Sequence, residues 1–343
     1  MCKVLRKSDA EEWRSLLVRA AADDLFFQPE YLWLNEIIIP GEPECFVYRD
    51  RELLVLYPYL RRPITGTPWS DITSAYGYGG FIAQPRDADL SAFHEAFCTY
   101  CRREGIVSEF VRFHPAFDNQ ANGAASLLEL RYHQPVVSVD YTEAGVRFEG
   151  AIKKEVWKKL RRAGQHGVQV ITDESGEYTE EFIRLYEGTM EMRHATAFYY
   201  FDHAFFRRMH ELLGSRSVTF VALHEGRMIG GLLVLFSDSV GYNFLSCSDY
   251  TYNHLGTNEL LQFTALEWAQ RRPLAGYLLG GGRNGEDSLF QFKAKFSPLR
   301  KRFFVGKRVH LQEIYRELCN RSGVQMDTPE GNGGAPRFPL YRN

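Results

Sequence analysis

Residues 278–296 read LLGGGRNGEDSLFQFKAKF, and no other stretch of the chain is as specific. Three consecutive glycines at the end of a strand-like run let a backbone approach a ligand closely. The helix predicted after them places Phe292 and Phe296 on one face and directs Lys293 and Lys295 differently. Taken alone, the same pattern also fits a tight turn followed by an apolar anchor and two solvated lysines.

Around this stretch, hydrophobic periodicity divides the chain into two halves with the same order of elements, namely two helices, three strands, a helix and a strand. In the second half these are expected at 178–193, 202–213, 218–223, 228–236, 241–246, 257–270 and 276–279, after a basic helix at 149–163. In the first half, the Gly/Pro/Tyr-rich segment 63–79 is expected as a long loop. The repeat is too long for a solenoid, so the pattern predicts two related α/β domains with a ligand-binding cleft between them.

The expected limits of the domains follow from this order. The first domain is expected at residues 1–145 and the second at 146–310. A C-terminal helix at 311–327 is expected to pack back on the first domain. Residues 328–343 contain several glycines and three prolines, so they are expected as a mobile tail.

Composition and charge bound the class of protein. The chain has 343 residues, 14% of them aromatic, and its 41 basic side chains almost balance 43 acidic ones. This composition excludes a disordered chain and a protein that coats nucleic acid non-specifically. No apolar run reaches the ~20 residues that span a bilayer, and the N-terminus lacks a signal-peptide core. We therefore expect a soluble, cytoplasmic protein.

Six cysteines are scattered along the chain, and only Cys98 and Cys101 form a C-x-x-C pair. The pair lies in an amphipathic helical pattern at 90–103, without the second pair or the His-x-x-x-His that would complete a zinc site. In a cytosolic setting this favours reduced structural thiols, with zinc or redox chemistry as the alternative. No metal is expected.

Four stretches together resemble the Fem family of aminoacyl-tRNA-dependent aminoacyltransferases: 71–80 (DITSAYGYGG), 111–115 (VRFHP), the helix and turn at 154–168, and 278–296. The resemblance extends from Phe27 to about Phe304. It implies two tandem GNAT-like domains with mixed, twisted sheets flanked by helices. It also implies transfer of an amino acid from the 3′ end of a charged tRNA to an amine, with aminoacyl-tRNA as co-substrate and no further cofactor.

The resemblance implies a catalytic role for Lys293, which occupies the Phe-Lys-x-x-Phe position, and Lys295 is the nearby alternative. Aminolysis of a ribose ester passes through a tetrahedral oxyanion, and one fixed donor beside it lowers the barrier by about 2.7–4 kcal/mol. Glu286 and Asp287 are candidates for the base that deprotonates the acceptor amine. Capping of the following helix is the favoured role for Asp287.

This chain departs from the family's cell-wall members where they bind nucleotide phosphates. Neither segment 31–36 nor segment 197–201 carries the expected cation, and His114 stands where those members have an acid. The acceptor is therefore expected to be a small peptide or natural-product amine, with a peptidoglycan interpeptide bridge as the alternative. The residues expected to line the substrate site are Tyr76, Tyr78, Arg112, His114, Tyr242, Asn258 and Arg283.

Basic residues cluster on the helix that opens the second half, where four of the ten lysines lie within seven residues. Positions 154, 158 and 162 repeat every four residues and share a face. Such a face can follow a phosphate backbone, although a charge run is also typical of a solvated helix. The residues expected to bind tRNA are Lys153, Lys154, Lys158, Lys159, Arg161, Arg162 and Lys301.

An acyl-CoA-dependent GNAT N-acyltransferase is the second enzymatic alternative. Such enzymes bind pyrophosphate with a Gln/Arg-x-x-Gly-x-Gly/Ala loop at a helix N-terminus. The corresponding junction at 252–260 has a single glycine, and the literal match at 120–125 falls one strand too late. A binding module that has lost activity is a third alternative. We expect a monomer whose partners are charged tRNA and an amine acceptor.

Overall fold

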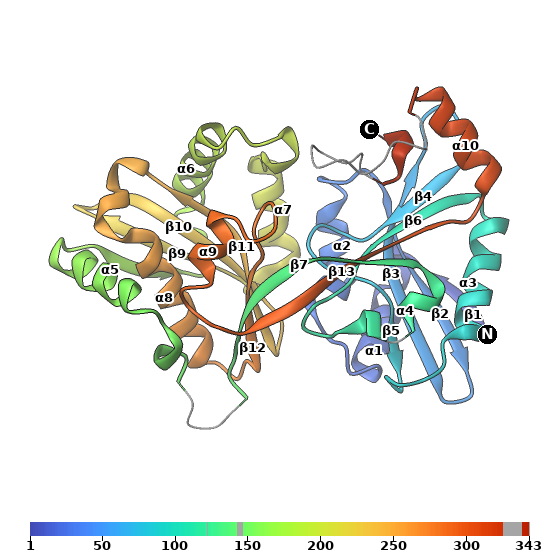
Figure 1. The fold of residues 1–343 in the computed structure, drawn as a ribbon, viewed down its shortest axis with the longest axis horizontal. Coiled ribbons are helices and arrows are strands. Elements are labelled where there is room, and N and C mark those ends of the chain that lie inside the picture. The colour runs from blue at the N-terminus through green and yellow to red at the C-terminus, as the bar shows by residue number, and fades with distance from the viewer. Residues whose placement is uncertain (122, 143–146, 325–337, 343) are drawn as a thin grey trace. The chain divides into compact units, whose positions relative to one another are not determined.

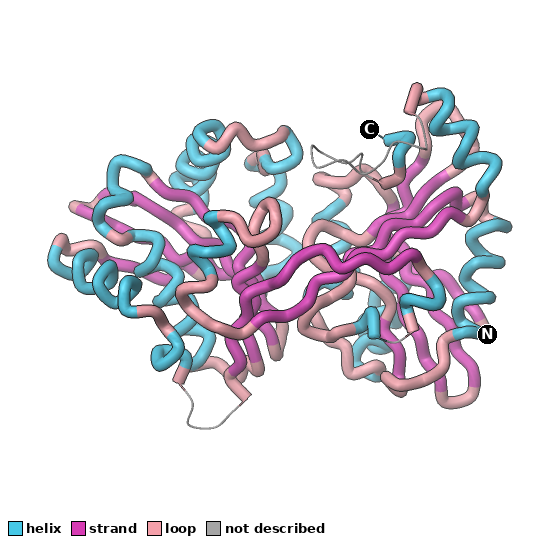
Figure 2. Tube along the Cα trace, in the orientation of Figure 1, coloured by secondary structure: helices cyan, strands magenta, loops and turns pink. Residues whose placement is uncertain are grey.

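The computed structural model describes residues 1–121, 123–142, 147–324 and 338–342. The chain divides into two compact units (Figure 1). Unit 1 contains residues 1–133 and 303–343, and unit 2 contains residues 134–302. Each unit combines parallel and antiparallel strand pairs with helices (Figure 2).

The elements of unit 1 come from both ends of the chain. They are β1 (Cys2–Leu5), α1 (Ala10–Arg19), α2 (Pro29–Asn35), β2 (Glu42–Asp50), β3 (Leu53–Pro63), β4 (Ser70–Thr73), β5 (Ile82–Gln84), α3 (Ser91–Arg103), β6 (Ile106–Arg112), α4 (Ala124–Leu127), β13 (Arg300–Val309) and α10 (Gln312–Arg321). The short helix η8 (Leu340–Arg342) ends the described chain.

Unit 2 is continuous in sequence. Its elements are β7 (Glu129–Asp140, from residue 134 onward), α5 (Lys154–Gln165), β8 (Gln169–Asp173), α6 (Thr179–Met192), α7 (His203–Leu213), β9 (Ser217–His224), β10 (Arg227–Phe236), β11 (Val240–Ser248), η7 (Tyr250–Leu255), α8 (Thr257–Gln270), β12 (Gly276–Gly280) and α9 (Ser288–Lys293).

The two sheets share one topology. Unit 1 has the order β1-β2-β3-β4-β6-β13, and unit 2 has the order β8-β9-β10-β11-β12-β7. In both, the first three pairings are antiparallel, the fourth is parallel and the last is antiparallel. The internal repeat that the sequence predicts is therefore a repeat of strand order and direction.

The last strand of each sheet is exchanged between the halves of the sequence. β7 follows β6 along the chain but pairs with β12, and β13 follows β12 but pairs with β6. Residues 134–142 therefore belong to unit 2 and residues 303–310 to unit 1, which differs from the expected limits of 1–145 and 146–310. Segment 143–146, which contains the expected boundary, lies outside the described residues.

Helices cover both faces of the unit 2 sheet, as two adjacent glycines on β10 demonstrate. A Cβ on Gly230 would lie 3.0 Å from Thr257 Cγ2 of α8, whereas one on Gly231 would lie 2.7 Å from Phe182 Cδ2 of α6. Successive side chains of a strand point to opposite faces. Glycine at both positions therefore lets α8 and α6 pack closely on the two faces.

The core of unit 1 is rich in aromatic rings. Phe93 and Phe97 on α3 pack against Phe46 and Tyr57 of the sheet. The segment 63–79, expected as a loop, contains strand β4, which pairs with β3 and β6. This strand has only four residues and is surrounded by Pro, Gly and Thr, so it was too short to identify from the sequence. None of the described helices is long and apolar enough to span a membrane.

The C-terminal part of the described chain packs on unit 1. Helix α10 buries Tyr315 and Leu318 against Val107. Residues 338–342, within the tail expected to be mobile, are instead held, because Tyr341 Oη donates to Asp71 Oδ2 at 3.0 Å and Tyr341 is buried. Residues 328–337 and 343 of that tail lie outside the described residues.

Candidate functional site

The glycine-rich turn after β12 surrounds the amino group of Lys293, which projects from the end of α9. Lys293 Nζ donates to the Gly281 carbonyl oxygen at 2.8 Å. Gly280 has φ +90°, and a Cβ there would lie 2.9 Å from Lys293 Nζ. A Cβ on Gly281 would lie 2.5 Å from Gln134 Nε2, so the glycines allow the turn to close tightly around the lysine.

Asp287 holds this turn together. Its Oδ1 accepts from the Phe290 N–H at 3.0 Å, as an N-cap of α9, and its Oδ2 accepts from the N–H groups of Arg283 and Asn284 at 2.9 and 3.1 Å. Burial acts to raise the pKa of Asp287, but these backbone donors outweigh it and lower the pKa. Asp287 is therefore an ionised capping residue, whereas Glu286 is exposed to solvent.

Lys293 is partly buried, and its surroundings weaken its affinity for a proton. Burial lowers its pKa to about 8; Asp287 opposes this shift and Arg193 adds to it. At neutral pH most of the amino groups are still charged. A fixed ammonium group with N–H donors at the end of a strand can stabilise an oxyanion.

Two neighbours of this turn were not identified from the sequence. Gln134 Nε2 donates to the Gly282 carbonyl oxygen at 3.2 Å, and Arg193, the C-cap of α6, donates from Nε to Tyr250 Oη at 2.9 Å. Arg193 supplies a cation near Lys293. It lies a few residues before segment 197–201, which lacks the cation that the cell-wall members of the Fem family carry there. Its place at the end of a predicted helix was the only available signal.

Lys295 points elsewhere. Its Nζ lies 3.2 Å from Glu155 Oε1 of α5, and its carbonyl oxygen accepts from the Lys153 N–H at 2.9 Å. It therefore anchors the start of α5 and does not reach the glycine turn alongside Lys293.

Helix α5 presents the expected basic face. Only Val156 and Ala163 of its side chains are fully buried, and Lys159 is partly buried. The exposed cations are Lys153, Lys154, Lys158, Arg161 and Arg162. No acidic side chain of the described residues lies within ion-pair distance of them. Lys301 is also exposed, but it lies on β13 and not on α5. Hydrogen bonds from Thr142 lower the pKa of Asp140, and the charge of Lys301 lowers it further.

The remaining predicted substrate residues of unit 2 differ in exposure. Arg283 is exposed on the glycine turn, and Asn258 is partly buried in the first turn of α8. Tyr242 is only 2% exposed, so it is a core residue of β11 and lines no open surface. The next residue, Asn243, accepts from Tyr277 Oη at 2.5 Å and exchanges hydrogen bonds with Gln262.

The four predicted residues of unit 1 come together around the loop after β4. Arg112 Nε donates to the Gly77 carbonyl oxygen at 2.7 Å, and the ring of Tyr78 lies 5.2 Å from that of His114. Tyr76 is fixed from α2, since its N–H donates to Asn35 Oδ1 at 2.8 Å. Burial raises the pKa of Tyr78 to about 12.

His114 has a structural environment. It is fully buried, its Nε2 lies 3.4 Å from Asp24 Oδ1, and the rings of Phe26, Phe27 and Phe117 surround it. It therefore supports the Tyr78 loop from within and does not itself face a substrate. Asp24 and Asn35 complete this cluster, and no motif or spacing in the sequence marks either residue.

Residues 151–294 match the family model described as an acetyltransferase (GNAT) domain. The match lies within unit 2 and supports a GNAT-like fold for this unit. A comparison with curated proteins gives no match.

Solved structures extend the likeness to both units. FemX has a TM-score of 0.68 at 12% identity, over 92% of this chain and 99% of that one. The C-terminal domain of a putative lysylphosphatidylglycerol synthetase from Agrobacterium fabrum has a TM-score of 0.54 at 12% identity, over 91% and 96%. A tandem GNAT protein from the clavulanic acid biosynthesis pathway has a TM-score of 0.50 at 12% identity, over 90% and 99%. The predicted fold of two tandem GNAT-like domains is confirmed.

In the GNAT domain, the N-terminus of α8 is covered. A Cβ on Gly256 would lie 2.7 Å from the Lys159 carbonyl oxygen, so the backbone of α5 packs directly against the junction where α8 begins. Thr257 is buried at the first position of α8. An anion bound at this helix terminus would have to share the space with a carbonyl oxygen, which repels it.

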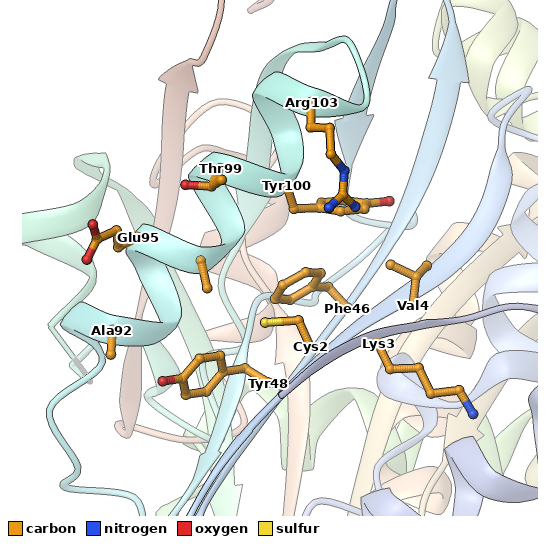
Figure 3. Close-up of a pocket in the computed structure, with 11 residues that line it drawn as sticks. Cys2, Lys3, Val4, Phe46, Tyr48, Ala92, Glu95, Thr99, Tyr100 and Arg103 are labelled. Carbon is orange, nitrogen blue, oxygen red and sulfur yellow. The ribbon is translucent and has the colours of Figure 1, made fainter.

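A separate groove of about 550 Å³ lies in unit 1 between α3, β1 and β2 (Figure 3). Its floor is apolar, with Val4, Phe46 and Tyr48, and its rim carries Glu95 and Arg103. None of the predicted site residues lines it. It is therefore distinct from the glycine turn of the GNAT domain.

Proposed function

We propose that this protein is an aminoacyltransferase that moves an amino acid from aminoacyl-tRNA to the amine of a small peptide or natural product, forming a peptide bond. The observation that carries the proposal is the position of Lys293. A partly buried amino group, charged at neutral pH, is fixed on the carbonyl of a glycine turn at the end of β12.

The chemistry requires little beyond this arrangement. An aminoacyl ester is already activated, so positioning of the two substrates and stabilisation of the oxyanion supply most of the rate. Lys293 stabilises the tetrahedral oxyanion as the acceptor nitrogen attacks the ester carbonyl, and the ribose oxygen then leaves. Asp287 and the glycines keep the amino group in place.

The basic face of α5 supports a nucleic-acid co-substrate. Its five exposed cations are free to meet phosphates, and Lys295 with Glu155 ties this helix to the segment that follows Lys293. The name of the Agrobacterium synthetase also describes aminoacyl transfer, of a lysyl group to a lipid.

Acyl-CoA is the competing donor, because the family model that matches residues 151–294 describes an acetyltransferase domain. The covered N-terminus of α8 argues against a pyrophosphate there. The two donors predict different products and can be compared in one assay.

The deciding experiment incubates the full chain with aminoacyl-tRNAs that carry labelled amino acids and with a pool of peptide and small-molecule amines. The expected result is label that becomes ribonuclease-resistant and attached to an amine of new mass. Acetyl transfer from acetyl-CoA, with no product from charged tRNA, would overturn the proposal.

The tRNA contact has its own test. The double variant Lys154→Ala with Lys158→Ala should bind charged tRNA more weakly and lower the salt dependence of log K by about two. Arg316→Ala with Arg321→Ala on α10 removes the same charge from another exposed helix and serves as the control. Equal affinity of both variants would exclude α5 as the tRNA surface.

A further inference from the structure

Helix α3 of unit 1 carries a pair of thiols that the proposed reaction does not use. Cys98 and Cys101 are 4% and 0% exposed, and both are free. They are one helical turn apart, so their Cα atoms lie about 5 Å from each other. This separation is within the range that a disulfide spans.

Two histidines from different elements converge on these thiols. His94 lies one turn before Cys98 on α3, and its Nε2 is 3.4 Å from Cys98 Sγ. His310, just after β13, lies close enough to both thiols to affect their pKa. Its side chain is buried, and its Nε2 lies 3.3 Å from Glu109 Oε1 of β6.

Further charges and hydroxyls complete the cluster. Glu109 also accepts from Tyr57 Oη at 3.0 Å, so its carboxylate is fixed between a phenol and an imidazole. Arg308 of β13 contacts His94 Nε2 and donates to the Leu127 carbonyl oxygen at 2.5 Å. Cys98 therefore lies beside two imidazoles, and one of these, His94, is in contact with a guanidinium.

These surroundings distinguish the two thiols. Burial acts to raise the pKa of Cys98, but His310 and His94 outweigh it and lower the pKa to about 6. Burial raises the pKa of Cys101 to about 11. Burial also acts to lower the pKa of His310, but the two thiols and Glu109 outweigh it and raise the pKa. A thiolate beside a protonated thiol is the usual arrangement of an attacking and a resolving cysteine.

We propose that Cys98 and Cys101 form a reversible redox site that a peroxide oxidises to a disulfide. The Cys98 thiolate attacks one oxygen of hydrogen peroxide; the O–O bond breaks, Cys98 becomes a sulfenic acid, and hydroxide leaves. The Cys101 sulfur then attacks Cys98 Sγ, an S–S bond forms, and the sulfenic oxygen leaves as water with the Cys101 proton. A thiol reductant restores both thiols.

A metal site is the other use that such residues suggest. Among the described residues, no three His, Cys, Asp or Glu side chains are arranged to hold a metal ion. Access limits the oxidant to a small molecule, because Cys98 is buried, whereas its neighbour His94 is partly exposed. This inference does not depend on the proposed aminoacyl transfer.

The test exposes the full chain to a small excess of hydrogen peroxide and analyses its peptides by mass spectrometry. Cys98 and Cys101 fall in one tryptic peptide, 87–102, which should become lighter by two hydrogen atoms and regain them with a thiol reductant. Cys45 and Cys247 are buried thiols whose pKa burial raises, so they serve as internal controls. Cys98 should react at least about tenfold faster than either.

Two variants separate the steps. Cys101→Ser should stop at a sulfenic acid on Cys98 that dimedone traps, and Cys98→Ser should leave Cys101 reduced. Oxidation of Cys98 no faster than that of Cys45, or a mixture of disulfides with other cysteines, would overturn the proposal. Stoichiometric zinc in the purified protein, released only when the thiols are modified, would overturn it as well.

Discussion

Lys293 Nζ donates a hydrogen bond to the carbonyl oxygen of Gly281 over 2.8 Å, so the amino group is fixed by the turn that it would serve. This bond uses one of the three N–H donors of the amino group. The contact explains how a flexible lysine can act from a defined point.

Replacing Lys293 tests its role directly. Lys293→Met should reduce kcat by about 10²–10³-fold, the effect of removing one oxyanion donor, while leaving the affinity for charged tRNA unchanged. Single-turnover rates and tRNA binding measured on the same preparation check both parts. A variant as active as the parent would remove the main support for the proposed function.

The pH dependence follows from the pKa of about 8 for Lys293. Below that pH the amino group is charged and can stabilise an oxyanion, so activity should fall as pH rises through about 8. Lys293→Arg keeps its charge to much higher pH, and its falling limb should move up or disappear. An identical falling limb in both proteins would assign it to another group.

Gly282 tests the closure of the turn. A Cβ at this position would collide with the Gly285 carbonyl oxygen and with Asp287 Oδ1, so Gly282→Ala should open the turn and lower activity with Lys293 intact. Gly164→Ala on α5, where no heavy atom lies within 4 Å, is the matched control and should leave activity unchanged. Thermal unfolding of both variants separates loss of the turn from loss of the fold.

Asp287 should matter through its capping bonds. Asp287→Ala removes the acceptor for three backbone N–H groups and should destabilise the protein by about 1–2 kcal/mol. Asp287→Asn keeps an acceptor and should retain most of the stability and activity. Loss of activity in the Asn variant with full stability would instead indicate a role in proton transfer.

The buried carboxylate of Asp71 should control the C-terminal contact. It pairs with Arg62 Nε at 2.7 Å and Arg342 Nε at 2.6 Å, and it accepts from Tyr341 Oη. Asp71→Ala would leave partly buried cations without their partner and should lower the free energy of unfolding by about 3–5 kcal/mol. Arg342→Ala should have a smaller effect, because Arg62 still balances the carboxylate. Chemical denaturation of both variants measures the difference.

The sequence was sufficient for the α/β class and the repeated order of elements, since periodicity reports which side chains face a core. It was insufficient for the pairing of β7 and β13. Nothing in the local sequence of either strand specifies which of two similar strands, β6 or β12, it joins. Strand β4 was missed for a related reason, because its pairing with β3 and β6 overrides a turn-rich composition.

The sequence predicted some residues of the site well and others poorly, and the reasons are physical. Lys293 belongs to a local motif, so its neighbours are fixed by nearby residues. Tyr242 and His114 were selected by their place along the chain, whereas burial depends on elements distant in sequence, and both are core residues. Gln134 and Arg193 approach the turn from β7 and α6, and only the fold brings them there.

The exchange of β7 and β13 has a consequence for folding during synthesis on the ribosome. Unit 2 is encoded without interruption by residues 134–302, whereas unit 1 still lacks its last strand and α10 when that stretch has been synthesised. The amino-terminal part of the chain therefore stays incomplete, because β6 has not yet paired with β13, while all residues of unit 2 have been synthesised. Order of synthesis and order of completion are opposite, and a nascent chain whose first 302 residues have left the ribosome should contain a finished second unit and an unfinished first one.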